Sequence, residues 1–209
     1  CFIEGDTLET SDVVNGGAEL FLYQSGYLTI KGYDDGVYIL GFPNFEVRKA
    51  LYRVVVPALT MKSNSEVVSA QSFLRKMMQD GNTAEAKKAL KALIADVPYS
   101  NKKMASMDME ERYRLIMSTI FRALGFRVEV ERMLATGRID MIVEVPSIIY
   151  VLELKLSNNG GISAAESQIK EKSYTEPFKA DKRKVIALAV ELDETGKGLI
   201  DWKEVDESL

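Results

Sequence analysis

The sequence has no histidine and a single cysteine, Cys1, among its 209 residues. The absence of histidine excludes Ser-His-Asp triads and zinc centres with histidine ligands. A lone cysteine excludes a disulfide framework within the chain, which favours a reducing, cytoplasmic setting. No apolar run approaches the roughly 18 residues that a membrane-spanning helix needs. We therefore expect neither a signal peptide nor a membrane partner.

The chain also lacks the G-x-x-x-x-G-K-[ST] sequence that cradles phosphates in P-loop NTPases, so we expect these residues not to bind ATP. Its formal net charge of −4 gives no general attraction to nucleic acid, and any such contact must depend on a local basic patch. The composition, 46% hydrophobic and 28% charged, is typical of a globular protein. The length allows one large domain or two small ones.

The stretch from 137 to 156, GRIDMIVEVPSIIYVLELKL, predicts two β-strands joined by a turn at Pro146–Ser147. Side chains in a strand repeat every two residues, so Glu153 and Lys155 share a face, and Asp140 lies on the polar face of the preceding strand. A strand this apolar should be buried, where charged groups are costly. Two carboxylates and a lysine brought together by a hairpin predict a site for a hard divalent cation.

Asp140 followed by Glu153-Leu154-Lys155 resembles the signature of the PD-(D/E)XK nuclease superfamily, with Ile139 in the place of the proline. The resemblance implies that Asp140, Glu153 and the backbone carbonyl of Leu154 hold Mg²⁺ or Mn²⁺. It also implies that Lys155 orients the attacking water or stabilises the transition state. The structural alternative is a salt bridge at a sheet edge.

The order of the predicted elements agrees with that resemblance. A helix capped by Asp108 precedes strands over 126–130, 139–145 and 148–156. A second helix begins after Ser163, and an apolar strand covers 184–192. This order gives an α/β fold class: the α-β-β-β-α-β core of restriction-endonuclease-like folds, with a mixed central sheet.

Further site residues come from the same resemblance. A glutamate on the first helix of many relatives faces the metal, followed by an aromatic-histidine pair; here we expect Glu111 in that role, although the histidine is missing. The alternative role for Glu111 is to stabilise the helix N-terminus. The run from Ala165 to Tyr174 matches the pattern A-x-x-Q-I-x-x-K-x-Y. It implies that Gln168 approaches the site, that Tyr174 packs or binds a nucleic-acid phosphate, and that Lys172 contacts nucleic acid, unless this is simply an amphipathic helix with a solvated face.

Basic residues could supply phosphate contacts. Arg138 stands two residues before Asp140, where it could grip a phosphate or pair with Glu129 or Glu131. Lys182 and Arg183 belong to the densest basic run, which could track a nucleic-acid backbone or could be a solvated surface.

The chain is expected to have three parts. Residues 1–60 predict a helix, a hairpin and a helix, a small winged-helix-like α+β segment, and they resemble the end of an AAA-ATPase-like region in a bacterial protein family in which a PD-(D/E)XK domain follows. The resemblance implies that an ATPase-like region precedes this chain in the intact protein. Residues 61–105 predict a helical connector, and residues 106–209 the nuclease-like domain.

These features favour a metal-dependent endonuclease that hydrolyses nucleic acid, DNA above all, and that could act as a homodimer. The alternative is a non-catalytic module that docks DNA or protein within a larger ATPase-like protein.

Overall fold

The computed structural model describes residues 1–9, 17–60, 62–95 and 107–206, which form two compact units, Cys1–Val54 and Val55–Leu209. The predicted division at 60 and 105 differs from this one, because the helices within 62–95 belong to the same unit as the large sheet. The boundary predicted at 105 lies outside the described residues. Across the described ranges, no helix combines the length and hydrophobicity needed to cross a membrane.

The first unit contains a small antiparallel sheet in the order β1-β3-β2. The elements of this unit are β1 (Phe2–Glu4), α1 (Gly5–Glu9), α2 (Gly17–Gln24), β2 (Thr29–Asp34) and β3 (Val37–Gly41). The predicted hairpin is present, and its two turn residues have positive φ angles, 41° at Asp35 and 85° at Gly36. The sequence did not predict β1. The helix α3 (Phe45–Thr60) begins in this unit and continues past Pro57.

The second unit is built on a five-stranded sheet in the order β4-β5-β6-β7-β8. The strands are β4 (Arg127–Met133), β5 (Arg138–Glu144), β6 (Ile148–Leu156), β7 (Lys184–Leu192) and β8 (Leu199–Val205). β6 and β7 pair in parallel and the other neighbours are antiparallel, so the sheet is mixed. With α6 (Met109–Ala123) and α7 (Gly161–Lys172), the predicted α-β-β-β-α-β core is confirmed.

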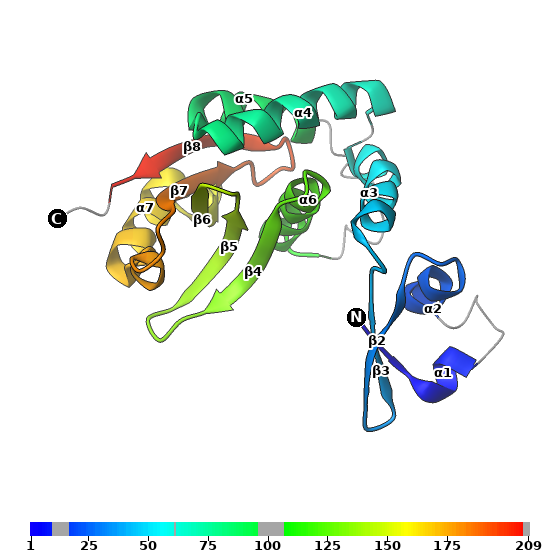
Figure 1. Ribbon diagram of the computed structural model, residues 1–209. Helices are drawn as coiled ribbons and strands as arrows, with labels where there is room; N and C mark the ends of the chain where they lie inside the picture. The colour runs from blue at the N-terminus through cyan, green and yellow to red at the C-terminus, as the bar shows by residue number, and fades with distance from the viewer. Residues whose placement is uncertain (10–16, 61, 96–106, 207–209) are drawn as a thin grey trace. The chain divides into compact units, whose positions relative to one another are not determined.

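Alternation along β6 divides the core between the two faces of the sheet. Tyr150, Leu152 and Leu154 pack into the cluster that includes α6, α4 (Asn64–Asp80) and α5 (Thr83–Ile94). Ile149 and Val151 pack into the cluster on the other face, which includes residues of α7. Helices therefore cover both faces, as Figure 1 shows for α6 and α7.

The helices predicted to form a separate connector are anchored to the sheet. Tyr150 donates its hydroxyl to the carbonyl of Met78 at 2.6 Å, and the indole of Trp202 donates to the carbonyl of Thr83 at 2.9 Å. The apolar faces of α4 and α5 pack against the sheet, which removes them from water. Their N-caps are Ser63, in a capping box with Glu66, and Asn82.

Candidate active site

The site lies where β5 and β6 stop pairing. Their ladder runs from Glu144 and Ile149 to Met141 and Leu152, so Asp140 and Glu153 follow its last pair. The backbone N–H of Leu154 donates to Asp140 Oδ2 at 2.9 Å. The Asp140 side chain thus takes the place of the next backbone hydrogen bond in the ladder. It joins the carboxylate of β5 to the backbone of β6.

Both carboxylates are buried, with exposed fractions of 3% for Asp140 and 1% for Glu153. Lys155 Nζ lies 2.6 Å from Glu153 Oε1, whereas the buried Glu153 Oε2 has no hydrogen-bond partner in the structure. Burial, together with the neighbouring Asp140 carboxylate, raises the pKa of Glu153 to about 8. Burial disfavours the charged form of Lys155, but its hydrogen bond to Glu153 and the surrounding carboxylates raise its pKa above the usual value.

Two arginines converge on this cluster. Arg114 Nη1 lies 3.3 Å from Asp140 Oδ1, and Arg114 Nη2 lies 3.5 Å from Glu131 Oε1. Arg138 Nη1 lies 2.8 Å from the same Glu131 oxygen. The alternative in which Arg138 pairs with Glu131 is therefore the arrangement present. The sequence had not singled out Arg114 as a site residue.

The helix glutamate beside the cluster is Glu110, not Glu111. Burial raises the pKa of Glu110, as does the Asp140 carboxylate, while Lys155 and Arg114 lower it, so its carboxylate lies within the field of all three. Glu111 is exposed. The physical reason is helical phase, because Glu110 lies one turn before Arg114, the residue that contacts Asp140. Glu111 therefore does not occupy the position beside the metal site that was expected for it.

Gln168 and Tyr174 form a hydrogen-bonded chain to the backbone of β5 close to Asp140. Gln168 donates to the hydroxyl of Tyr174 at 2.9 Å, and that hydroxyl donates to the carbonyl of Arg138 at 2.7 Å. Tyr174 has an exposed fraction of 0%, so it packs rather than presenting a surface to nucleic acid. Lys172 is exposed, and its carbonyl accepts from Thr136 in the loop before β5.

The basic run before β7 is not brought to this cluster. Arg183 pairs with Asp181 at 2.7 Å and with Glu144 at 2.9 Å. Glu144 is at the far end of β5, about 13 Å along the strand from Asp140. Lys182 is exposed. Phosphate contacts by Lys182 and Arg183 stay predictions for a surface apart from the carboxylates.

The donors present fit a hard divalent cation. No group of three or more His, Cys, Asp or Glu side chains suited to a metal occurs in the described part of the chain. The predicted ligand set contains only two such side chains, Asp140 and Glu153, and its third ligand is a backbone carbonyl. The unpartnered Oε2 of Glu153 beside Asp140 is an oxygen that such an ion would satisfy.

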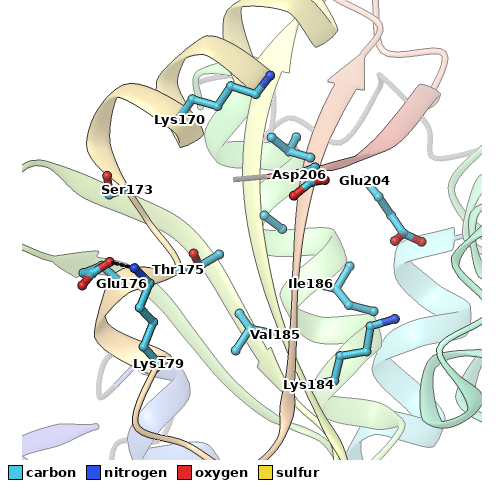
Figure 2. Close-up of a pocket in the computed structure, with 12 residues that line it drawn as sticks. Lys170, Ser173, Thr175, Glu176, Lys179, Lys184, Val185, Ile186, Glu204 and Asp206 are labelled. Carbon is cyan, nitrogen blue, oxygen red and sulfur yellow. Dashed lines mark ion pairs between the residues drawn. The ribbon is translucent and has the colours of Figure 1, made fainter. Parts of the chain in front are cut away.

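A separate groove of about 930 Å³ lies along α7, β7 and β8 (Figure 2). Its lining includes Lys170, Lys179, Lys184, Glu204 and Asp206, and it contains none of the carboxylates at the end of the β5–β6 ladder. The mixed charge of this lining selects no ligand class, so the carboxylate cluster is the candidate active site.

Comparison with known proteins gives two matches. Residues 108–202 match the family model of the PD-(D/E)XK nuclease superfamily. The chain is also 26% identical over 216 residues to an uncharacterized protein encoded in the vnfD 5′ region of Azotobacter chroococcum mcd 1. That match covers 97% of this chain and 40% of the relative, so the chain spans less than half of the relative's length. No solved structure matches.

The matched region begins at the cap of α6, ends within β8, and contains the whole carboxylate cluster. The element order and the Asp140, Glu153 and Lys155 constellation agree with the match. Residues 108–202, which lie within the second unit, belong to the PD-(D/E)XK nuclease superfamily.

Proposed function

We propose that the second unit hydrolyses phosphodiester bonds of nucleic acid, with DNA as the favoured substrate and Mg²⁺ or Mn²⁺ as the cofactor. The observation that carries the proposal is the buried pair Asp140 and Glu153, joined across two strands and flanked by Lys155. Buried ionisable groups of this kind are costly for a fold to keep, and they cluster at functional sites. The superfamily is one of nucleases.

Asp140, Glu153 and the carbonyl of Leu154 would hold the metal ion. When bound, a divalent ion lowers the pKa of a water molecule and neutralises charge that develops on the phosphate. Lys155 holds a proton beside Glu153 and supplies positive charge next to the reacting group. The Arg114 guanidinium keeps the Asp140 carboxylate oriented. Apolar side chains of β5 and β6 limit the access of water, which strengthens these electrostatic interactions.

The main test is a cleavage assay on single-stranded, duplex and branched DNA, with RNA as a further substrate and Mn²⁺ as the cofactor. We expect E153Q and K155M to lose at least 100-fold in rate while retaining their circular dichroism spectra. As a control, K88A changes an exposed lysine of α5 and should cleave like the wild type. Unchanged activity in both site variants would rule out this site.

The competing function is a docking module without catalysis, in which Lys155 and Arg114 merely balance the carboxylates. The unpartnered Glu153 Oε2 favours a metal site over a balanced salt bridge. Thermal melting distinguishes the two. A metal site gains stability as Mn²⁺ passes its dissociation constant, and E153Q should abolish that gain.

Three broader points belong to the same proposal. The first unit would be the tail of an ATPase-like region in a longer bacterial protein, the setting would be cytoplasmic, and cleavage could involve a homodimer. Size-exclusion chromatography with light scattering, carried out with and without DNA, would test the dimer.

A further inference from the structure

Glu131 has a backbone conformation that is unusual for its place in the fold. Its φ angle is +55°, in the left-handed region, although it lies in the middle of β4. Few residues other than glycine adopt such angles, and a long side chain does so only when its surroundings hold it there. Strain of this kind often marks a functional position.

The strained residue lies across from the candidate metal ligand. Val130 pairs with Met141 and Arg132 pairs with Ile139, so the register is unbroken and Glu131 stands opposite Asp140. Glu131 and Asp140 themselves do not pair, so the ladder between β4 and β5 is interrupted at this position. The local distortion of β4 is thus centred on the position opposite Asp140, the proposed metal ligand on β5.

The distortion places the Glu131 carboxylate between two guanidinium groups. One oxygen, Oε1, lies 2.8 Å from Arg138 Nη1 and 3.5 Å from Arg114 Nη2. The arginines come from different elements, α6 and β5, and Glu131 brings them to a common point. Arg114 also reaches Asp140 at 3.3 Å, which fixes that point beside the metal ligand.

Both arginines retain the capacity to bind an anion. A guanidinium has five N–H donors in a planar fork that matches phosphate, more than these described contacts engage. The Arg138 side chain is 47% exposed, so an anion can approach it from solvent, whereas the Arg114 side chain is 12% exposed and held in place. The pair therefore has one accessible and one fixed member.

We propose that Arg114 and Arg138 bind one phosphate of the substrate strand next to Asp140, and that Glu131 is the positioning residue for both. This inference rests on the proposed function. The competing explanation is that the cluster only fastens α6, β4 and β5 together, without contact to substrate.

The first experiment measures binding without cleavage. Fluorescein-labelled single-stranded and duplex DNA, and the matching RNA, are titrated in EDTA and followed by anisotropy. We expect R114Q and R138Q each to weaken binding at least fivefold, and each to reduce the slope of log affinity against log salt by about one. The matched control is R127Q, an exposed arginine of the same strand as Glu131 that pairs with Glu144, and it should stay within twofold of wild type.

Affinity and salt slope unchanged in both R114Q and R138Q would overturn the inference, as would the absence of binding to every probe. Cleavage by the wild type with Mn²⁺ is measured separately. A wild type that cleaves, with arginine variants that bind normally, leaves the proposed function intact and removes only the arginine pair.

The second experiment separates positioning from fold stability. Asn and Asp tolerate the left-handed region better than Glu, so E131N and E131D should fold without added strain. We expect E131N to keep the wild-type melting temperature or exceed it, yet to bind DNA at least threefold more weakly. E131D, which keeps the charge, should recover part of that loss. The E131N effect should disappear in the R114Q/R138Q background. A lower melting temperature with unchanged affinity would show a purely structural role.

Discussion

The Leu154 amide donates to Asp140 Oδ2 at 2.9 Å, so the middle residue of the Glu153-Leu154-Lys155 run holds the first carboxylate in place. Leu154 is itself fully buried in the core. Its side chain packs against the face with α4, α5 and α6, while its backbone faces the partner strand. The unspecified middle position of the signature thus has a structural task in this chain, because it joins core packing to the orientation of Asp140.

That relationship predicts the behaviour of D140N. The amide oxygen of Asn can still accept from Leu154, but the charge that attracts Arg114 and a metal is lost. We expect the free energy of unfolding to fall by about 1–3 kcal/mol, because a partly buried charged contact is broken. We expect the cleavage rate to fall at least 100-fold. Urea unfolding and the cleavage assay measure the two effects. D181N, which changes a carboxylate on the basic run, should retain activity, and activity retained by D140N would refute its role.

The pKa of Glu153, raised to about 8, makes metal binding depend on pH. Below pH 8 the carboxyl is protonated and must release its proton before it can bind a cation. Mn²⁺ affinity should therefore rise with pH between 6 and 8, by up to about tenfold per unit for a single proton. Isothermal titration at several pH values measures this slope, which E153Q should lack. A flat profile in the wild type would contradict the proposed ligand.

The same shift has a consequence for the metal-free protein. The pKa of Glu153 is higher in the folded state than its ordinary value of 4.5, so the folded state retains the proton longer. This carboxyl therefore contributes stability that is full below pH 4.5 and is lost as the pH rises through 8. Melting curves in EDTA should show that E153Q loses less stability than the wild type over this range. Parallel curves for the two proteins would be inconsistent with the shift.

Local pattern was sufficient to predict the strands that carry the signature. Alternation over 139–145 and the apolar run over 148–156 identified β5 and β6, and period-two spacing placed Glu153 and Lys155 on one face. The apolar run over 184–192 corresponds to β7. These segments are buried on both faces, and sequence composition reports burial directly.

Features that depend on contacts distant in sequence could not be predicted in the same way. Glu110 and Glu111 are both acidic residues in a first turn, and only the placement of α6 against Asp140 distinguishes them. Residues four apart share a helix face, so Glu110 and Arg114 could be grouped from the sequence, but not the fact that this face meets Asp140. The left-handed φ of Glu131 has no local signature. The sequence predicted helices within 61–105, but it did not show that α4 and α5 pack against the sheet.

Tyr174 offers a test of how β5 is supported. Y174F removes the hydroxyl that donates to the Arg138 carbonyl and accepts from Gln168, and it leaves both groups without that partner. We expect a loss of about 1–3 kcal/mol in the free energy of unfolding. Urea denaturation measures it, with Y33F as the control because Tyr33 is 62% exposed. Equal stability of Y174F and wild type would mean that this hydrogen-bonded chain contributes nothing.

Cooperativity between α5 and the sheet can be followed through Trp202, the single tryptophan of the chain. Leu90 of α5 is fully buried in the cluster that also contains Trp202. L90A should cost about 2–5 kcal/mol, because it leaves a cavity in that cluster. If α4, α5 and the sheet unfold as one unit, the fluorescence midpoint of Trp202 in urea must shift together with the helical circular dichroism signal. K88A, at an exposed position on the same helix, should leave the midpoint in place. A fluorescence midpoint unmoved by L90A would instead support an independent connector, as the sequence alone had suggested.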